Sequence, residues 1–292
     1  MDQRHHPGGK LTSRPGSCLI NGTIPEHEGK GVLPVLKITV LVENSAPPHL
    51  IAEHGLSFHL DCGGRTFLLD GGTGGGALLE NARRLGIDLA QVEGAALSHG
   101  HDDHAGGLAA FLKINAAAKV LARPQAAPAY ALDTADEARR PAGVDPDLFP
   151  NWRDRFDLAD GPRPLAQGLH LVPDSVDHEQ SLVAETARGL VVLNSCCHAG
   201  ADRIVAQVLE YFPQKRVYAL LGGFHLVGRH GMGSLGTAPA KVRALALALT
   251  QGLGVERIYT GHCTGSPALD LLQRAAPGHF FPLHTGDRIS FE

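Results

Sequence analysis

Three histidines and two aspartates lie within six residues, from His99 to His104, in the segment 97–107. Side chains of these types need a hydrogen-bonding partner or a compensating charge when buried, so they would make a poor hydrophobic core. Imidazole and carboxylate groups are the ligands of zinc and its neighbours. In an extended loop, alternation places His99 and His101 on one side and turns Asp103 and His104 towards a second position. The segment therefore predicts a metal-binding loop rather than a polar surface loop.

The elements that must position this loop are predicted from hydrophobic periodicity and turn residues. The expected strands are 35–42, 56–60, 66–69, 92–97, 119–122, 168–172, 181–185, 189–193, 216–221, 257–259, 280–283 and 288–291. The expected helices are 77–85, 107–114, 201–212, 238–253 and 267–275. Each half of the chain supplies a block of strands followed by strand-helix units. This order predicts an α/β fold with two sheets packed face to face and helices outside, a four-layer αββα sandwich.

Two segments stand apart from this pattern. Residues 1–33 are predicted to be a flexible leader before a catalytic domain at 34–292, because residues 1–31 lack apolar periodicity. Residues 124–164 form a long excursion with little regular pattern, which favours a lid or a substrate-facing insertion. Gly106 and Gly107 are expected to let the backbone turn sharply into the next helix.

Composition excludes several classes of protein. A chain of 292 residues with 43% hydrophobic and 19% charged residues can bury a sizeable core. The net charge of -4 and the scattered basic residues give no footprint for nucleic acid or an anionic membrane surface. No apolar run is long enough to span a bilayer. We expect a small-molecule substrate, and the oligomeric state is left open, a homo-oligomer included.

The five cysteines do not form a recognisable disulfide framework. Their number is odd, and Cys196 and Cys197 are adjacent. This usage favours a reducing compartment, the cytoplasm.

The spacing His99-x-His101-x-Asp103-His104 resembles the HxHxDH signature of the metallo-β-lactamase fold, and its position between a strand and a helix agrees. Four further segments resemble one branch of that superfamily, named after 7,8-dihydropterin-6-yl-methyl-4-(β-D-ribofuranosyl)aminobenzene 5′-phosphate synthase. They are the segments 53–57, 196–200, 222–226 and 262–265.

The resemblance implies a dinuclear site with two divalent ions, zinc first and manganese or iron as alternatives. His198 and His262 each follow a predicted strand and precede a helix, where a ligand would face the site. The expected ligands are His99, His101 and His198 for one ion, with Asp103, His104 and His262 for the other. The alternative for His198 and His262 is a hydrogen-bonded core histidine.

No acidic residue is expected to bridge the two ions. The family's usual Gly-Asp step is replaced here by Ser195-Cys196, so Cys196 is either a ligand or a neutral filler beside the ligands. Asp70 resembles the aspartate of the family's Asp-Thr-Gly element, with Gly71 in place of threonine. Its carboxylate is expected to support the ligand loop through hydrogen bonds.

Three more residues are candidates for substrate contact. His225 follows a predicted strand and two glycines, Gly222 and Gly223, which would allow close backbone approach to a ligand. It is expected to donate a proton or contact a substrate phosphate, with a structural role or a metal-ligand role as alternatives. Glu53 and His54 are expected at the mouth of the site, with an ordinary surface position as the alternative.

The leading hypothesis is a metal-dependent hydrolase or group-transfer enzyme acting on a small phosphorylated or pterin-like substrate. Two ions would activate water and polarise a phosphoryl or carbonyl oxygen, with Asp103 orienting the nucleophile. The branch name implies joining a dihydropterin-methyl diphosphate to an aminobenzene ribosyl phosphate with loss of diphosphate. The rivals are a metal-binding sensor without turnover and a di-iron oxidoreductase, whose loop normally carries Glu at the position of His101.

Overall fold

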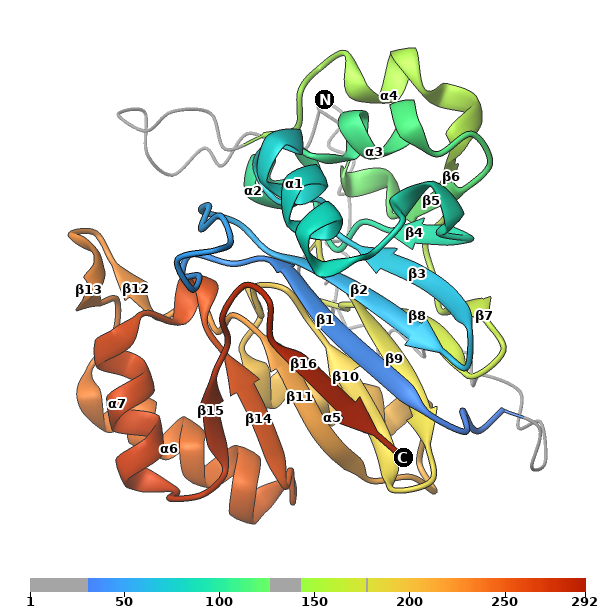
Figure 1. Ribbon diagram of the computed structural model, residues 1–292. Helices are drawn as coiled ribbons and strands as arrows, with labels where there is room; N and C mark the ends of the chain where they lie inside the picture. Colours follow the sequence, from blue (N-terminus) through green and yellow to red (C-terminus); the bar gives the residue numbers. More distant parts are fainter. Residues whose placement is uncertain (1–30, 127–142, 177) are drawn as a thin grey trace, which may run out of the picture.

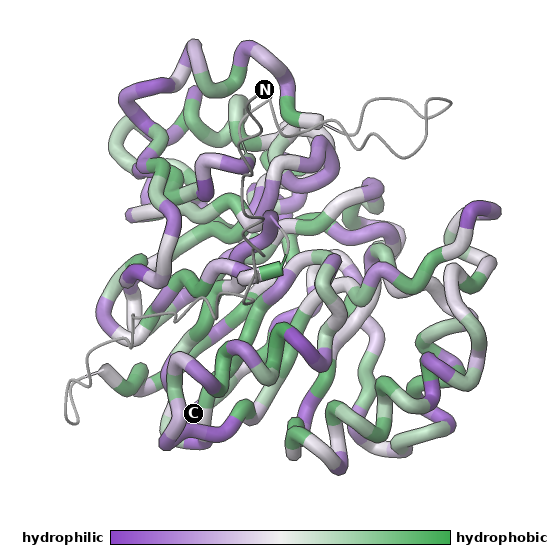
Figure 2. Tube along the Cα trace, turned by 180° about the vertical axis from the view of Figure 1, so that it is seen from behind, coloured by the Kyte–Doolittle hydropathy of each residue, from purple (hydrophilic) through white to green (hydrophobic). Residues whose placement is uncertain are grey.

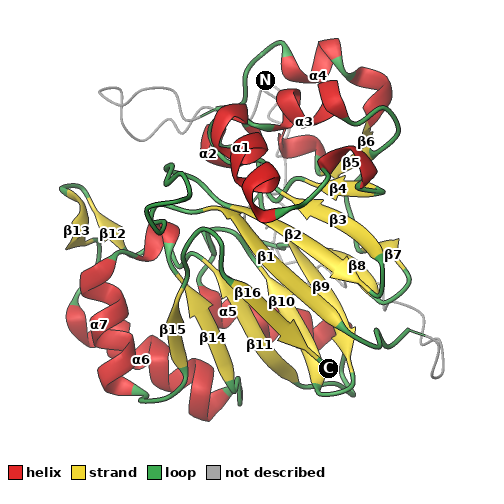
Figure 3. Ribbon diagram, viewed as in Figure 1, coloured by secondary structure: helices red, strands yellow, loops and turns green. Residues whose placement is uncertain are grey.

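The computed structural model describes residues 31–126, 143–176 and 178–292. Two seven-stranded sheets face each other, with helices on both outer sides (Figures 1 and 3). The first sheet has the order β16 (Arg288–Phe291), β1 (Leu36–Val42), β2 (Ser57–Cys62), β3 (Arg65–Leu69), β4 (Gly94–Ala96), β5 (Lys119–Ala122) and β6 (Phe156–Leu158). The second has the order β15 (Phe280–Pro282), β14 (Arg257–Thr260), β11 (Val217–Gly222), β10 (Gly189–Leu193), β9 (Gln180–Thr186), β8 (Leu169–Pro173) and β7 (Arg163–Ala166).

The helices complete four layers. The first sheet is covered by α1 (Gly75–Leu85) and α3 (Leu108–Ile114), with the single turns α2 (Asp102–Ala105) and α4 (Leu148–Asn151) nearby. The second sheet is covered by α5 (Ala201–Tyr211), α6 (Pro239–Leu247) and α7 (Ser266–Ala275). The helices α1, α5 and α7 are amphipathic, and Figure 2 shows hydrophobic and hydrophilic residues alternating along the outer parts of the chain trace. The expected αββα sandwich is confirmed.

Alternation along the strands builds three separate cores. In β10, Val191 and Leu193 point between the two sheets, whereas Leu190 and Val192 pack under the helices of the second sheet. A strand buried on both faces reads as a continuous apolar run, which is why this segment is recognisable in the sequence. The third core lies between the first sheet and its own helices. The core between the sheets therefore fixes them face to face and fixes the positions of their strand ends relative to each other.

Several elements differ from the expectations. The excursion 124–164 contributes α4 and the strands β6 and β7 to the fold, while residues 127–142 lie outside the described part. The helix expected over 238–253 is α6 followed by a π-helical turn at Ala248–Gly252. A small hairpin of β12 (Val227–Gly228) and β13 (Gly231–Leu235) was not expected, because its Gly-rich sequence has no apolar alternation.

The two chain ends of the described region also carry information. Most of the predicted leader, residues 1–30, lies outside the described residues. Leu33, at the end of that predicted leader, is buried and bridges to Thr186 of β9, so it belongs to the packed fold. At the other end, β16 pairs antiparallel with β1 and joins the first sheet although it follows the last strand of the second. Among the helices of the described residues, none is long and apolar enough to cross a bilayer.

Candidate metal centre

The predicted site residues lie in loops at the carboxyl ends of strands. His99 follows β4, and His198, His225 and His262 follow β10, β11 and β14. β10, β11 and β14 run parallel, so the loops that follow them leave the same edge of the second sheet. Open α/β sheets bind their ligands in the crevice outside this edge. The two facing sheets thus deliver all these side chains to one place.

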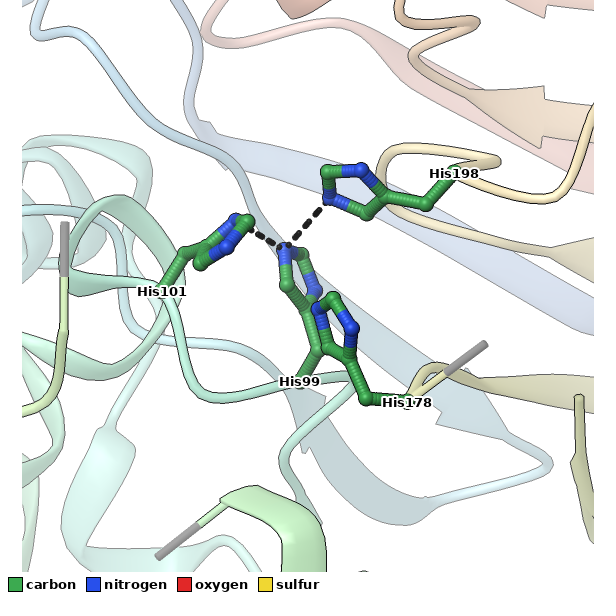
Figure 4. Close-up of side chains that lie close together, drawn as sticks. All are labelled: His99, His101, His178 and His198. Carbon is green, nitrogen blue, oxygen red and sulfur yellow. Dashed lines mark hydrogen bonds between the residues drawn. The ribbon is translucent and has the colours of Figure 1, made fainter. Parts of the chain in front are cut away.

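The structure brings His99, His101 and His198 together in a first donor group (Figure 4). Nε2 of the fully buried His99 lies 3.0 Å from Nδ1 of His101 and 3.3 Å from Nε2 of His198. The imidazole of His178, which sequence reasoning missed, lies beside them. One nitrogen from each of the four rings falls within 4.8 Å of the others.

The surroundings keep the imidazoles of His99, His101 and His198 neutral. Burial lowers the pKa of His99 well below its ordinary value, and it lowers the pKa of His101 to about 4 and that of His198 to about 2. The neighbouring histidines act in the same direction, because each positive ring would repel the next. Neutral imidazoles present lone pairs, which is the state that a metal ligand needs.

The second donor group contains Asp103, His104 and His262. A carboxylate oxygen of Asp103 lies 3.6 Å from Nε2 of His104, and its other oxygen lies 3.3 Å from Nε2 of His262. Cys196 also belongs here, because its Sγ lies 3.2 Å from Nε2 of His104. The Cys196 thiol, His104 and His262 form one candidate set of metal donors.

The charge of the second group centres on Asp103. Burial alone would raise the pKa of Asp103, but His104, His262 and His54 together lower that pKa well below its ordinary range. For His104 the balance is reversed, since burial lowers its pKa while Asp103 and Asp70 raise it to about 9. The second group is therefore built around a carboxylate that stays ionised.

Three imidazoles that aim Nε2 into the site, those of His99, His104 and His262, are held in place through Nδ1. Nδ1 of His99 lies 2.9 Å from Oγ of Ser98, and Nδ1 of His262 lies 3.1 Å from Oδ1 of Asn44. Such outer contacts fix the ring orientation and the tautomer of a metal ligand. Nδ1 of His104 is held in the same way by Asp70, at 2.9 Å.

Asp70 is the centre of this outer network. Its fully buried carboxylate accepts hydrogen bonds from the backbone N–H and the hydroxyl of Ser98, both at 2.7 Å, and from the hydroxyl of Ser195 at 2.5 Å. Ser98 follows β4 of the first sheet, whereas Ser195 follows β10 of the second. Asp70 therefore joins the ligand loops of the two sheets.

Two buried glutamates that sequence reasoning missed hold the remaining ligand loops. Glu179 accepts hydrogen bonds from the backbone N–H of Cys196 at 3.0 Å and of His198 at 2.6 Å. Glu43 accepts one from the backbone N–H of His262 at 2.6 Å. Burial raises the pKa of Glu179 to about 8. Glu43 directly follows β1 and Glu179 directly precedes β9. The hydrophobic pattern identifies these strands but does not show which backbone groups the neighbouring glutamates contact.

The donor set fits divalent ions. In the first group, the ring nitrogens of His99, His101 and His198 face one another at short distance. A cation between them would accept the lone pairs of all three. In the second group, Nε2 of His262 is buried and makes no hydrogen bond, because its approach to Asp103 lies outside hydrogen-bond geometry. Buried polar atoms normally have a bonding partner, and a metal ion bound at this position would provide one for Nε2 of His262.

The candidate substrate contacts lie in three different settings. His54 has 64% of its side chain exposed, and its Nε2 lies 3.2 Å from Asp103. His225 is also exposed, and its ring centroid lies 4.5 Å from that of His198. The carboxylate of Glu53 instead accepts a hydrogen bond from the backbone N–H of Gly74 at 2.8 Å, so it holds the loop before α1.

The glycines of the site act differently from the expectation. Gly106 and Gly107 have ordinary right-handed φ values, so no sharp turn requires them. A Cβ atom on Gly107 would instead lie 2.1 Å from the carbonyl oxygen of Gly71. A Cβ on Gly223 would lie 2.4 Å from the Sγ of Cys263, so this glycine accommodates the protein's own chain rather than a ligand.

Backbone strain is concentrated in the same loops. Among the described residues, four that are not glycine have positive φ angles, namely Asp70 at 60°, Cys197 at 52°, His225 at 49° and His262 at 46°. A non-glycine residue in this region is uncommon and costs of order 1–3 kcal/mol. All four lie at strand ends beside the donor groups, where dense hydrogen bonding holds them in place.

Comparison with known proteins identifies relatives over most of the chain. Residues 54–183 match the family model of the metallo-beta-lactamase superfamily. A protein of Methanocaldococcus jannaschii, named 7,8-dihydropterin-6-methyl-4-(beta-D-ribofuranosyl)-aminobenzene-5'-phosphate synthase, is 28% identical over 88% of this chain and 97% of its own length.

Solved structures agree with this result. A crystal structure described as a metal-dependent hydrolase of the beta-lactamase superfamily superimposes with a TM-score of 0.71 and 28% identity, covering 87% of this chain and 98% of the other. The metallo-beta-lactamase fold protein YhfI from Bacillus subtilis has a TM-score of 0.57 at 11% identity, covering 88% of this chain and 100% of its own, and supports the fold alone.

Proposed function

We propose that the chain, which resembles the metallo-β-lactamase superfamily over most of its length, is an enzyme with two adjacent divalent ions, zinc first. One ion would be held by His99, His101 and His198, and the other by Asp103, His104 and His262. The observation that carries the proposal is the convergence of these six side chains, from three separate loops, into two neighbouring donor groups.

The ions would supply Lewis-acid chemistry, polarising a phosphoryl or carbonyl oxygen and making water acidic enough to act near neutral pH. The chain's own residues orient the reaction. Asp103, held ionised among His54, His104 and His262, accepts a hydrogen bond from the attacking group and directs it. Asp70 and Glu179 keep the ligand loops still while charge develops.

Two exposed imidazoles would contact the substrate. His225 is exposed and stands beside His198, where it donates a proton to the leaving group or binds a substrate phosphate. A hydrogen bond with Cys263 raises the pKa of His225, which favours its proton-carrying form. His54 has most of its side chain exposed, and its Nε2 lies 3.2 Å from Asp103 of the second group.

The proposed substrate is small and phosphorylated or pterin-like. Support comes from the M. jannaschii relative, which is named as a synthase of a pterin-containing phosphate. A second relative of equal identity is described as a hydrolase. In hydrolysis, water would attack the phosphorus or carbonyl carbon whose oxygen the ions polarise. In group transfer, the aminobenzene would attack the methylene carbon as the C–O bond to the ion-stabilised diphosphate breaks. The proposal therefore covers both. The acceptor, water or an aminobenzene, distinguishes them.

The first experiment combines metal analysis with a substrate screen. Purified protein should contain about two divalent ions per chain, and a His5→Ala, His6→Ala variant should contain the same number, which excludes the leader histidines as the source. Phosphodiesters, phosphomonoesters, lactones and pterin diphosphates are then tested with and without an aminobenzene ribosyl phosphate. Turnover that requires metal and is lost in His99→Ala supports the proposal, whereas metal-free protein contradicts it.

A metal-dependent sensor is the second candidate, and one observation favours it. Cys196 lies beside His104 where the family's bridging aspartate is expected. Two bound ions with no turnover on any of the four substrate classes would support the sensor. The free thiols of Cys62, Cys196, Cys197 and Cys263 support the proposed cytoplasmic location for either function.

A further inference from the structure

We propose that His178 is a fourth protein ligand of the first metal ion, which makes that position a closed cage of imidazoles and leaves the second ion as the one that meets the substrate. This inference rests on the proposed function, because it assigns one more residue to the same metal site. It concerns a side chain outside the HxHxDH signature and outside the six expected ligands.

The position of His178 matches that of its three neighbours. Its ring centroid lies 5.4 Å from that of His99, 5.2 Å from that of His101 and 5.1 Å from that of His198. One nitrogen from each of these four rings lies within 4.8 Å of all the others. Figure 4 shows His178 beside His99, within the same cluster as His101 and His198.

The backbone after His178 is anchored to two of the ligand loops. The carboxylate of Glu179 accepts hydrogen bonds from the loop of His198. The next residue, Gln180, donates its backbone N–H to the carbonyl oxygen of Ser98 at 2.9 Å, directly before His99. Both anchors directly follow His178 in the chain and hold it beside the first donor group, where one of its ring nitrogens lies within 4.8 Å of a nitrogen of each of the other three rings.

The two donor groups then differ in kind. The second ion has three proposed ligands, Asp103, His104 and His262, and each candidate set that the described residues offer at that position also contains three donors. A zinc position with four protein ligands is closed, whereas one with three keeps a place for water or substrate. The first ion would accordingly anchor the loops and exchange slowly, and the second would exchange faster and carry the reaction.

Cobalt(II) titration of the metal-free full-length protein tests this assignment. Wild type should bind two ions in two distinguishable steps. Removing an outer contact of a metal ligand costs about 10–100-fold in affinity, so losing a direct ligand should cost at least as much. His178→Gln should weaken the tighter step by at least about tenfold and alter the visible spectrum of the first cobalt ion. The matched control His279→Gln, in the loop before β15, should titrate like wild type.

X-ray absorption of wild type loaded with one zinc equivalent gives a second measurement that does not depend on a variant. Four nitrogen donors of imidazole type are expected around the first ion. Three imidazoles with a water, or a His178→Gln protein with unchanged affinity and spectrum, would overturn the role of His178 and leave the proposed function standing. If wild type itself binds no ion, the proposed function fails instead.

Discussion

At the scale of single residues, the site depends on side chains that never meet the substrate. Asp70 reaches His104, Ser98 and Ser195 with one buried carboxylate, and so connects the loops of both sheets. Glu43 and Glu179 hold the backbone of the loops that carry His262 and His198. The positions of the donors therefore depend on three buried carboxylates as well as on the donors themselves.

Replacing Asp70 by Asn keeps the size of the side chain but removes its charge and one acceptor. The imidazole of His104 then loses the partner that fixes its tautomer, and the second ion should bind about 10–100-fold more weakly. Competition with a chelating dye measures the two affinities. Asp270→Asn, on the exposed face of α7, is the matched control and should bind both ions as wild type does. Equal affinities in Asp70→Asn and wild type would contradict the assigned role.

Glu179→Gln tests the other sheet's loop. The amide replaces one of the two oxygens that accept from the N–H groups of Cys196 and His198, so one buried donor loses its partner. We expect a loss of about 1–3 kcal/mol in the free energy of unfolding and weaker binding of the first ion. Urea unfolding and metal titration provide the two readings. Glu93→Gln, at an exposed position, is the comparison variant. If Glu179→Gln and Glu93→Gln had the same free energy of unfolding, the prediction would be refuted.

Residue types and spacing indicated most of the donors. Three imidazoles and two carboxylates in six residues have few other uses, so the loop at His99 was predictable. His178 and Glu179 were not, because a His-Glu pair before a strand has many roles and only the packing of the two sheets brings it to His99. Sequence spacing describes one loop at a time, whereas these contacts join loops about 80 residues apart.

At the scale of elements, the ligand loop is packed directly against the glycine-rich loop that follows Asp70. Gly107 lies against the backbone of Gly71, and Gly106 lies against that of Thr73. This close contact holds the short helix α2 against the loop that follows β3, and the side chain of His104 in α2 is buried there. Close approach of two backbones, rather than turn geometry, explains why small residues occur here.

Gly107→Ala should therefore disrupt the site. Its Cβ would lie 2.1 Å from the carbonyl oxygen of Gly71, and this backbone atom cannot rotate away as the end of a side chain could. We expect a lower melting temperature together with loss of the second ion. Gly76→Ala in α1 is the matched control, since its Cβ meets nothing within 4 Å, and a helix gains up to about 1 kcal/mol from this change. A Gly107→Ala protein as stable as Gly76→Ala would contradict this packing argument.

Strands and helices with a strong period were predicted well, and elements defined by distant partners were not. β10 is recognisable from Leu190 to Leu193, where four consecutive residues are apolar. β6 has an exposed Leu158 and exists because it pairs with β5 at the edge of the sheet. The place of β16 beside β1 could not be predicted either, because pairing between the two ends of a chain leaves no local pattern.

At the scale of the whole molecule, the two sheets, each with its own helices, contribute residues to one site at the edge that they share. The first sheet brings the loop of His99 to His104, and the second brings His198, His225 and His262. The core between the sheets fixes the distance between these loops. Stability of the sandwich and geometry of the site are consequently coupled.

Stability should also fall in mild acid, in part through His59 of β2. Burial lowers the pKa of this imidazole below its ordinary value of 6.5, while Asp61 raises it less. Below about pH 6.5 the unfolded chain binds a proton at this position that the folded chain does not, so folding is weakened as the pH falls towards the folded pKa. His59→Gln removes this proton uptake.

Urea unfolding of metal-free wild type and His59→Gln between pH 5 and pH 8 measures the effect. The free energy of unfolding of wild type should fall relative to that of the variant below about pH 6.5 and should run parallel to it above. Parallel curves over the whole range would show that the pKa of His59 is the same in both states.

Anomalous X-ray diffraction from crystals of the zinc-loaded protein would locate both ions and show which of the six side chains hold each one. Two anomalous peaks per chain are expected. One should lie among His99, His101 and His198, and the other among Asp103, His104 and His262. A zinc-loaded crystal with no peak at these residues, or with peaks only elsewhere on the chain, would contradict this assignment.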